Sequence, residues 1–474
     1  MATQPRLPKR IGRLDRATVV TVLASVLLAI LTGLATAKLG SLQHQLKAVL
    51  IVAAGLTMVI AALRPDIGLL ILLALSPFEL AFYGTNSNQV MLVLLALVLA
   101  WRIRTRAIPW WISAGGLMVV IGGFVSVIGA HNRSLALEGA VDWLCAFVIL
   151  FVALTVLRER EDASRRMVDI FVGSAVIVVF FGFLQKAGID AIVGEPFDTG
   201  VPNSFFSYYT VYAGYIALAS TLATAEILVA LEEHRPLRVS AFGAAMVFML
   251  VGLAASTSRG GLVALGAGWV MLAVLNMRRA SVFGRVIVVI AVFIVAAFAV
   301  TPHSEILTLE HRVAQSNGSL GEDKTRFAIQ KAGEEALTNH PFGLGYGNFP
   351  YYVSSYVRTA YVHQPFFHAQ ETSVQVGLDA GWLGLAGFWL LVASPILLVI
   401  KHGKGGSSAV RASGFAAALV GFMAQGLYDY LLWDLAFLVF FVAMLWGSVH
   451  ALRVDELASA SEEADLPIPS SLPV

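Results

Sequence analysis

The segment 302–375 gathers the side chains best suited to chemistry. Half of the ten histidines lie in it: His303, His311, His340, His363 and His368. Three arginines accompany them: Arg312, Arg326 and Arg358. The stretch 342–367 of this segment holds nine aromatic residues: Phe342, Tyr346, Phe349, Tyr351, Tyr352, Tyr356, Tyr361, Phe366 and Phe367. Flat rings cover the apolar faces of sugars, and the planar guanidinium group suits phosphate. The segment favours a ligand that is part sugar and part phosphate, the alternative being an aromatic belt at a membrane boundary.

Arg259 is the sharpest single signal. It lies in the run Ala254 to Gly261, where small residues flank it and apolar segments lie on both sides. An arginine in or beside a membrane span is costly and predicts an anionic partner. The alternative is a side chain that only extends to the interface. Small neighbours favour the functional interpretation because a bulky head group can approach.

Metal and redox chemistry have little support in the sequence. Cys145 is the single cysteine and lies in an apolar run, which indicates a core residue. His363 and His368 are five residues apart without a carboxylate at supporting spacing, and a zinc site needs three or four ligands. Asp142, Asp429 and Asp434 could line a cavity, but capping or pairing is the favoured interpretation.

The composition indicates a protein solvated mainly by lipid. Of 474 residues, 58% are hydrophobic and 13% are charged, about half the charge of an average soluble chain. The formal net charge of +2 argues against nucleic acid as a partner. Fourteen apolar runs, with an uncertainty of about two, are long enough to be spans. They are 17–37, 47–63, 67–83, 88–101, 108–129, 138–157, 167–185, 209–231, 240–257, 260–277, 283–301, 376–400, 412–428 and 431–450.

The basic residues predict the direction of these spans. With a cytoplasmic N-terminus, 22 of the 32 Lys and Arg residues fall on the inward side. This asymmetry is typical of the positive-inside rule. We therefore predict a multi-pass membrane protein with both termini cytoplasmic and with the segments 186–208 and 302–375 on the outer side.

Five regions follow from this topology. They are a cytoplasmic tail (1–16), a transmembrane bundle (17–301) with a small periplasmic loop (186–208), a large periplasmic loop (302–375), C-terminal spans (376–450) and a disordered cytoplasmic tail (451–474). The large loop is predicted to contain a helix at about 323–339, in which Phe327, Ala332, Ala336 and Leu337 approximate helical spacing. The fold class is all-α, with about 12–14 transmembrane helices.

Four stretches together resemble one family. They are Arg64 to Leu69, Ser258 to Gly260, the run from Arg326 through Asn339 to Phe349, and Gln375 to Gly384. In this order around one large outward loop, they resemble the O-antigen ligase and polymerase family of bacterial envelope glycosyltransferases, called WaaL-like and Wzy-like. The resemblance covers most of the chain and implies a fold similar to the GT-C class. It also implies a location in the bacterial inner membrane, with the active face periplasmic.

The resemblance implies a glycan transfer that inverts the anomeric centre and needs no cofactor and no metal. The donor would be a glycan on undecaprenyl pyrophosphate and the acceptor a second glycan. Arg259 matches a family arginine that holds the pyrophosphate, with Arg326 and Arg312 as helpers. Tyr346, Asn348, Tyr352 and Asn203 are the candidate glycan contacts.

The proton acceptor is the least defined part of the predicted site. The family has His-Asn eleven residues before the first glycine of Gly-x-x-Gly, and this chain has Gln370 and Glu371 there, with His368 two residues upstream. Glutamine cannot act as a base. The candidates are therefore His368, Glu371 and His340.

Several alternatives remain open. A ligase and a polymerase share fold and donor, and we favour slightly a polymerase of exopolysaccharide or O-antigen repeats. A chain-length regulator is a possible partner of such an enzyme. The rivals from other classes are a membrane transporter and a non-catalytic relative that only binds glycans. A transporter predicts ionisable residues at midplane depth, and few are visible in the sequence.

Overall fold

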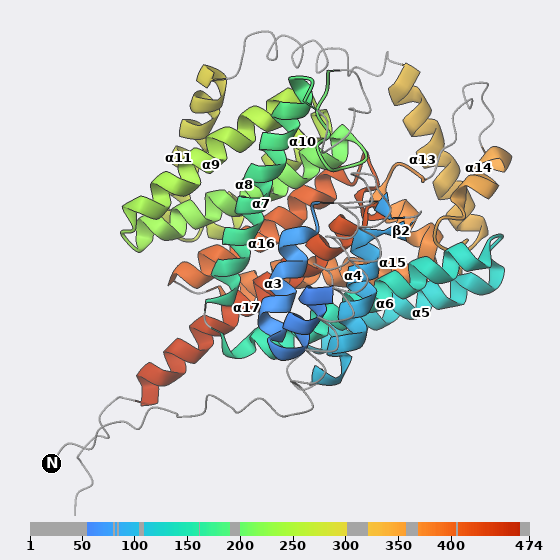
Figure 1. The fold of residues 1–474 in the computed structure, drawn as a ribbon, viewed down its shortest axis with the longest axis horizontal. Coiled ribbons are helices and arrows are strands. Elements are labelled where there is room, and N and C mark those ends of the chain that lie inside the picture. Colours follow the sequence, from blue (N-terminus) through green and yellow to red (C-terminus); the bar gives the residue numbers. More distant parts are fainter. Residues whose placement is uncertain are drawn as a thin grey trace, which may run out of the picture. The chain divides into compact units, whose positions relative to one another are not determined.

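The computed structural model is built almost entirely of helices (Figure 1). It describes residues 55–78, 81–82, 85–103, 109–160, 162–189, 200–300, 321–356, 368–403 and 406–464. The strands in these ranges form one hairpin of two-residue strands, β1 (Ala81–Phe82) and β2 (Thr85–Asn86). The all-α prediction is confirmed.

Ten helices of the described residues are long and apolar enough to cross a membrane. They are α5 (Trp110–Gly129), α6 (Arg133–Val156), α7 (Ala163–Lys186), α8 (Tyr209–Glu232), α9 (Pro236–Ala255), α10 (Arg259–Asn276), α11 (Ala280–Val300), α15 (Thr372–His402), α16 (Gly406–Gln425) and α17 (Leu435–Ala464). Two shorter apolar helices are α3 (Pro65–Leu75) and α4 (Ser87–Leu99). The chain is therefore a multi-pass membrane protein.

Most predicted spans coincide with these helices, with three differences. The helix over the last expected span, 431–450, continues to Ala464, so the start of the expected tail 451–474 is helical. The span expected at 67–83 ends at Leu75. The spans expected at 412–428 and 431–450 are separated by a longer connector than predicted, because α16 ends at Gln425 and α17 begins at Leu435. The expected span 17–37, the start of the next one and the tail 1–16 lie outside the described residues.

The chain divides into two compact units, Met1–Ile71 and Leu72–Val474. In the first unit, residues 55–63 are helical, and α3 begins directly afterwards at Pro65. Arg64 pairs with Asp66 at 3.3 Å. A Cβ added at Gly68 would lie 2.4 Å from Cβ of Ala61, so glycine is needed for close packing at this turn.

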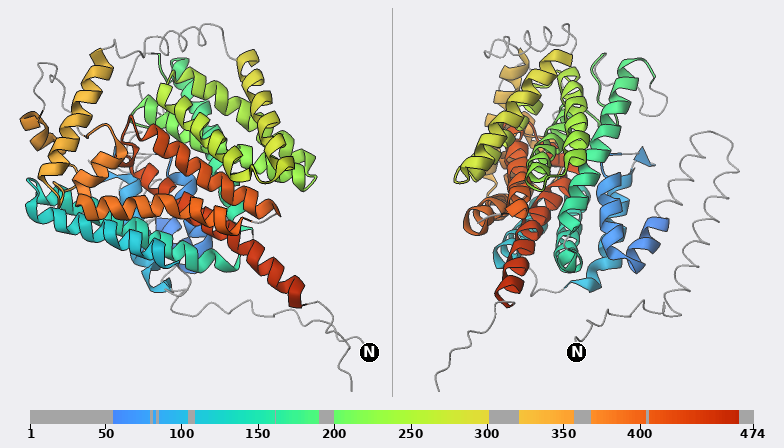
Figure 2. Two further views of the ribbon diagram at one scale, coloured as in Figure 1. Left: turned by 180° about the vertical axis from the view of Figure 1, so that it is seen from behind. Right: turned by 90° about the vertical axis from the view of Figure 1, so that its left-hand side faces the viewer.

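In the second unit, α8 and α17 form the centre of the helix bundle. Their apolar windows are 94% and 100% buried, against 17% for α11. α5 lies along α15, and α10 lies beside α16 (Figures 1 and 2). Short connectors make consecutive helices antiparallel. We call the end at which α8, α10, α15 and α17 begin the site end, and the opposite end the ion-pair end.

The large loop folds as a helical cap with its own apolar core. α13 (Gly321–Asn339) and α14 (Phe349–Tyr356) pack together, and α13 also packs on α15. The core includes Ile329, Ala336, Leu344, Phe349 and Leu378. Helix α13 agrees with the expected helix at 323–339, although Phe327 is exposed and does not join this core. Residues 302–320 and 357–367 are outside the described residues.

Candidate functional site

Two glycines join the segment 341–348 to helix α15. Gly343 and Gly381 have φ of +85° and +69°, values that favour glycine. A Cβ added at Gly343 would lie 2.7 Å from the backbone nitrogen of Gly381. The amide of Leu344 donates to the carbonyl of Leu378, and the amide of Trp382 donates to that of Pro341. The break in α15 at Gly381 is thus repaired by hydrogen bonds with the loop.

Beneath this junction, Asp379 holds three elements together. Its carboxylate accepts from Gln375 at 2.7 Å and from the Tyr430 hydroxyl at 3.0 Å. The backbone amide of Gly347 is a further donor. Burial and the neighbouring Asp379 carboxylate raise the pKa of the Tyr430 phenol well above its ordinary value. Tyr430 therefore acts here as a neutral hydrogen-bond donor.

The connector 426–434 joins α16 to α17 at the site end. Its carbonyl groups accept hydrogen bonds from the start of α15, because Thr372 donates through its backbone amide to the Gly426 carbonyl and through its hydroxyl to the Asp429 carbonyl. Asp429 accepts from the Tyr430 amide, and Asp434 accepts from the Ala436 amide at the start of α17. These contacts support the capping interpretation of both aspartates.

Arg259 is the first residue of α10. Ser258 caps the helix by accepting from the Gly261 amide, and Thr257 precedes it at φ +50°, a strained value for a β-branched residue. Gly260 brings this helix start against the end of α16, because an added Cβ would lie 3.3 Å from Cγ of Gln425, the last residue of α16. The partly positive helix N-terminus, of which Arg259 is the first residue, therefore lies beside the residue that directly precedes the connector.

Helix α13 spans the connector from the other side. Arg326 donates to the backbone carbonyl of Tyr428 at 3.3 Å. Gln330 donates to the carbonyls of Leu427 and Gln370, at 2.8 and 3.3 Å. One face of α13 thus brings Arg326 to the connector, which begins directly after the α16 residue that the α10 start contacts.

His368 lies on the same connector. Its ring is stacked with Trp433, with centroids 6.3 Å apart, and meets Tyr430 edge to face at 5.7 Å. Burial lowers the His368 pKa below its ordinary value; the Asp429 carboxylate opposes this effect and the Arg326 guanidinium adds to it. His368 is therefore neutral near pH 7, the form in which imidazole accepts a proton.

Glu371 precedes α15 and faces α13. Burial raises its pKa above the ordinary value, and the Glu334 carboxylate raises it further. Gln370, directly before it, has φ of +60°. Glu371 is therefore a second candidate for proton transfer.

The other predicted site residues lie elsewhere. His340 follows α13 and meets Tyr352 of α14, with ring centroids 5.3 Å apart. Tyr346 packs on α6, since a Cβ added at Gly139 would lie 2.1 Å from its ring. Burial and the Asp379 carboxylate raise the Tyr346 pKa. Arg312, His303, His311, His363 and Arg358 are outside the described residues.

Both predicted asparagines have structural partners. Asn348 is buried; its side chain accepts from the Asn132 amide at 2.6 Å and donates to the Asn132 and Tyr346 carbonyls. Asn203 accepts from the Gln185 side chain at 2.9 Å and donates to the Phe206 carbonyl. These contacts fix the turns at 345–348 and 203–206.

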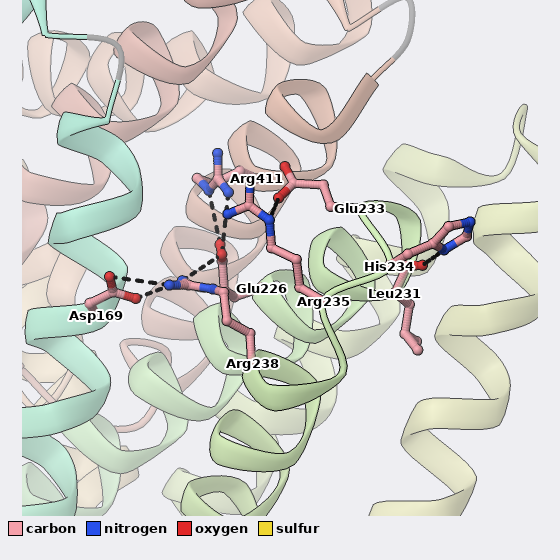
Figure 3. Close-up of polar contacts among 8 residues, drawn as sticks. All are labelled: Asp169, Glu226, Leu231, Glu233, His234, Arg235, Arg238 and Arg411. Atoms are coloured by element: carbon pink, nitrogen blue, oxygen red, sulfur yellow. Dashed lines mark hydrogen bonds and ion pairs between the residues drawn. The ribbon is translucent and has the colours of Figure 1, made fainter.

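A buried charge cluster was missed by the sequence reasoning. Glu226 is 1% exposed and pairs with Arg411 at 2.9 Å and Arg238 at 2.7 Å; Arg238 also pairs with Asp169 at 2.7 Å (Figure 3). The four residues come from α8, α16, α9 and α7, at the ion-pair end. The available signal was a glutamate and an arginine inside two apolar helices.

A group of three or more His, Cys, Asp or Glu side chains placed to hold a metal is absent from the described residues. The Arg326, His368 and Glu371 side chains suit phosphate binding and proton transfer instead.

Comparison with known proteins finds one family model that matches part of the chain. Residues 244–389 match the family model described as O-antigen ligase, Wzy_C. The matched segment runs from α9 into α15 and contains Arg259, Arg326, His368 and Glu371. A comparison with curated proteins gives no match. The match covers fewer than half of the 474 residues; over this segment the multi-pass membrane protein is similar to the O-antigen ligases, which supports an assignment to the O-antigen ligase and polymerase family.

Proposed function

We propose that the protein transfers a glycan from undecaprenyl pyrophosphate to an acceptor glycan at the periplasmic face of the inner membrane. The observation that carries the proposal is that Arg326 and His368 meet at the connector, and that the start of α10, with Arg259 as its first residue, packs on the end of α16 directly before that connector. The family match supports a lipid-linked donor and a glycan acceptor in general terms.

In the proposed reaction, an acceptor hydroxyl attacks the anomeric carbon of the donor from the face opposite the phosphate. The new glycosidic bond forms as the bond to the phosphate oxygen breaks, so the configuration inverts. Negative charge then develops on the leaving diphosphate, and the acceptor proton passes to a base. Arg259 and Arg326 would stabilise the diphosphate without a metal.

The experiment is Arg259→Ala in the full-length protein, with surface polymer measured in a deletion strain carrying the variant. Loss of one fixed cation at a developing charge lowers the rate by about 10²–10³-fold. Arg133→Ala, an exposed arginine at the start of α6, is the matched control and should leave polymer unchanged. Normal polymer from Arg259→Ala would contradict the proposal.

Two variants separate His368 from Glu371 as the base. Asp429→Asn removes a carboxylate that raises the His368 pKa, and Glu334→Gln removes one that raises the Glu371 pKa. In both cases the pKa of the affected group falls. The acid limb of the pH profile of kcat/KM should move to lower pH only in the variant next to the true base. Equal profiles in both variants would point to a different base.

Strain supports the placing of the site. Thr257 and Gln370, two of the described non-glycine residues with positive φ, directly precede the Ser258-Arg259 and Glu371 positions. Strained backbone persists where surrounding structure imposes it and is common at active sites. The proposed periplasmic location rests on the Lys and Arg distribution.

A polymerase of exopolysaccharide or O-antigen repeats is favoured slightly over a ligase that modifies lipid A core. Glycan length in a deletion strain distinguishes them. Loss of long polymer with capped lipid A cores intact identifies a polymerase, and loss of capping identifies a ligase. Uptake of lipid-linked glycan by proteoliposomes without new glycosidic bonds would instead favour a transporter, and binding without either would favour a non-catalytic relative.

A further inference from the structure

Aromatic residues stand before the two central helices. Tyr208 is the residue before α8, and Trp433 ends the short 3₁₀ turn that leads into α17. Their rings meet edge to face with centroids 5.7 Å apart, and the Trp433 ring also stacks with the His368 ring. Three rings from three distant segments thus form one row. We call Tyr208, Trp433 and His368 the aromatic row.

The row has a rigid base. Leu431 and Leu432 are buried at 0% and 2% exposure, which fixes the turn that carries Trp433. The turn that leads to Tyr208 is held by Asn203 and Gln185, since the Gln185 side chain also accepts from the Asn203 and Ser204 amides. Trp433 remains half-buried, so part of its surface is accessible. Because the backbone that carries the Trp433 ring is already fixed, binding a ligand to this ring loses little further conformational entropy.

Lipid is the ordinary neighbour of aromatic rings at a membrane boundary, but the position of the row argues against it. α8 and α17 are the two most buried spanning helices described. Their first residues therefore lie near the centre of the site end and not at its lipid-facing edge. Trp101 and Trp110, at 70% and 72% exposure, have the accessibility expected of rings that face lipid. A half-buried indole on a central helix has another role.

We propose that Trp433, whose ring meets Tyr208 edge to face, stacks against the pyranose ring of the acceptor's terminal sugar. This stacking holds the attacking hydroxyl of that sugar beside His368. The inference rests on the proposed transfer reaction. Pyranose rings have an apolar face that suits an indole, and the aromatic residues bury large areas at small entropic cost. The segment 426–434 lies beyond the residues that match the family model.

The acceptor fits this position better than the donor sugar does. The charged groups that suit the diphosphate come from Arg259 at the α10 start and Arg326 on α13. The Trp433 ring instead stacks with the His368 ring. A sugar lying on Trp433 is therefore next to the imidazole and not between the arginines. Only the acceptor must deliver a hydroxyl proton.

The test is steady-state kinetics of the full-length protein in lipid nanodiscs. The donor probe is lipid-linked oligosaccharide extracted from the deletion strain. The acceptor probes are the free oligosaccharide released from that extract by mild acid and the delipidated core oligosaccharide of the same strain. Trp433→Ala should raise the acceptor KM about ten-fold and change the donor KM less than two-fold. Trp433→Phe should restore the acceptor KM to within about three-fold of the original value.

Trp389→Ala is the matched control, because Trp389 is 45% exposed on α15 and is expected to face lipid. It should leave both KM values unchanged. If Trp433→Ala does not fold, Trp433→Met replaces it, since methionine fills volume without a flat face; the expected effect on the acceptor KM is the same. An unchanged acceptor KM, or an equal rise in the donor KM, overturns the inference.

The same assay separates this inference from the proposed function. If Arg259→Ala is inactive and Trp433→Ala keeps the original acceptor KM, the role proposed for the aromatic row is wrong and the proposed function stands. Full activity of Arg259→Ala, or no transfer by the original protein to either acceptor, rejects the proposed function itself.

Discussion

The two ends of the second unit use arginine in different ways. At the ion-pair end, Arg411 and Arg238 are bound to the carboxylates of Glu226 and Asp169 on other helices. At the site end, Arg326 contacts a backbone carbonyl, and Arg259 begins a helix among small residues. The first arrangement locks four helices together. The second places arginine side chains near the aromatic residues and turns at the ends of the apolar helices. Burial of an arginine is therefore a weaker guide to function than the identity of its partners.

The largest expected effect breaks the ion-pair end. Glu226→Ala leaves Arg411 buried without its carboxylate and should lower the free energy of unfolding by about 3–5 kcal/mol. The measurement is thermal unfolding of the detergent-solubilised protein. Asp162→Ala, which removes the partner of the exposed Arg166, is the control and should cost about 0.5 kcal/mol or less. A similar loss in both variants would mean that the cluster contributes little.

The second prediction sharpens the contrast at the site end. Arg259→Ala should reduce transfer by the factor given above while its unfolding temperature stays close to that of the original protein. The two variants, Glu226→Ala and Arg259→Ala, would then separate stability from activity. A loss of stability in Arg259→Ala as large as that in Glu226→Ala would show that both ends are structural.

The third prediction concerns the junction of loop and helix. Gly343→Ala places a Cβ against the Gly381 nitrogen at positive φ and should destabilise the protein by about 1–3 kcal/mol. Gly266→Ala in the middle of α10 meets nothing within 4 Å and should stabilise the helix by up to about 1 kcal/mol. The unfolding temperature should fall in Gly343→Ala and rise in Gly266→Ala. Changes in the same direction would contradict the role given to the junction.

The smallest expected effect is a shift in pH dependence. In Asp429→Asn, the His368 pKa loses the carboxylate that raises it and falls further below its ordinary value. If His368 is the base, it stays neutral to lower pH, so the acid limb of the kcat/KM profile moves down. Tyr428→Phe, in the same connector, is the control and should leave the limb in place. A shift to higher pH would reverse the assigned electrostatics.

The sequence predicted the membrane helices well because hydropathy reports burial in lipid directly. Helix α13 was also predictable from its spacing and acidic start. The connector 426–434 was not, because its leucines and aromatic residues are as apolar as the spans on either side. Tyr430 and Trp433 were missed for this reason.

The candidate site was predicted in part. Arg326 and His368 come together, although 42 positions separate them, because both segments pack on the connector. Nothing in the local sequence distinguishes Asn348, which bonds backbone groups, from an asparagine that binds sugar. Glu226 and Arg411 lie 185 positions apart, so their pairing is a property of the packed helices.

The bonds that join segment 341–348 to α15 have a consequence for how the protein opens. The amides of Leu344 and Trp382 are shared between the cap and a membrane helix. Exchange of these amides with deuterated water requires separation of both partners, so Leu344 should exchange together with the start of α15 and not with its own loop. The cap and the membrane helix then unfold as one cooperative unit, and the proposed acceptor side of the enzyme retains its shape as long as the bundle does.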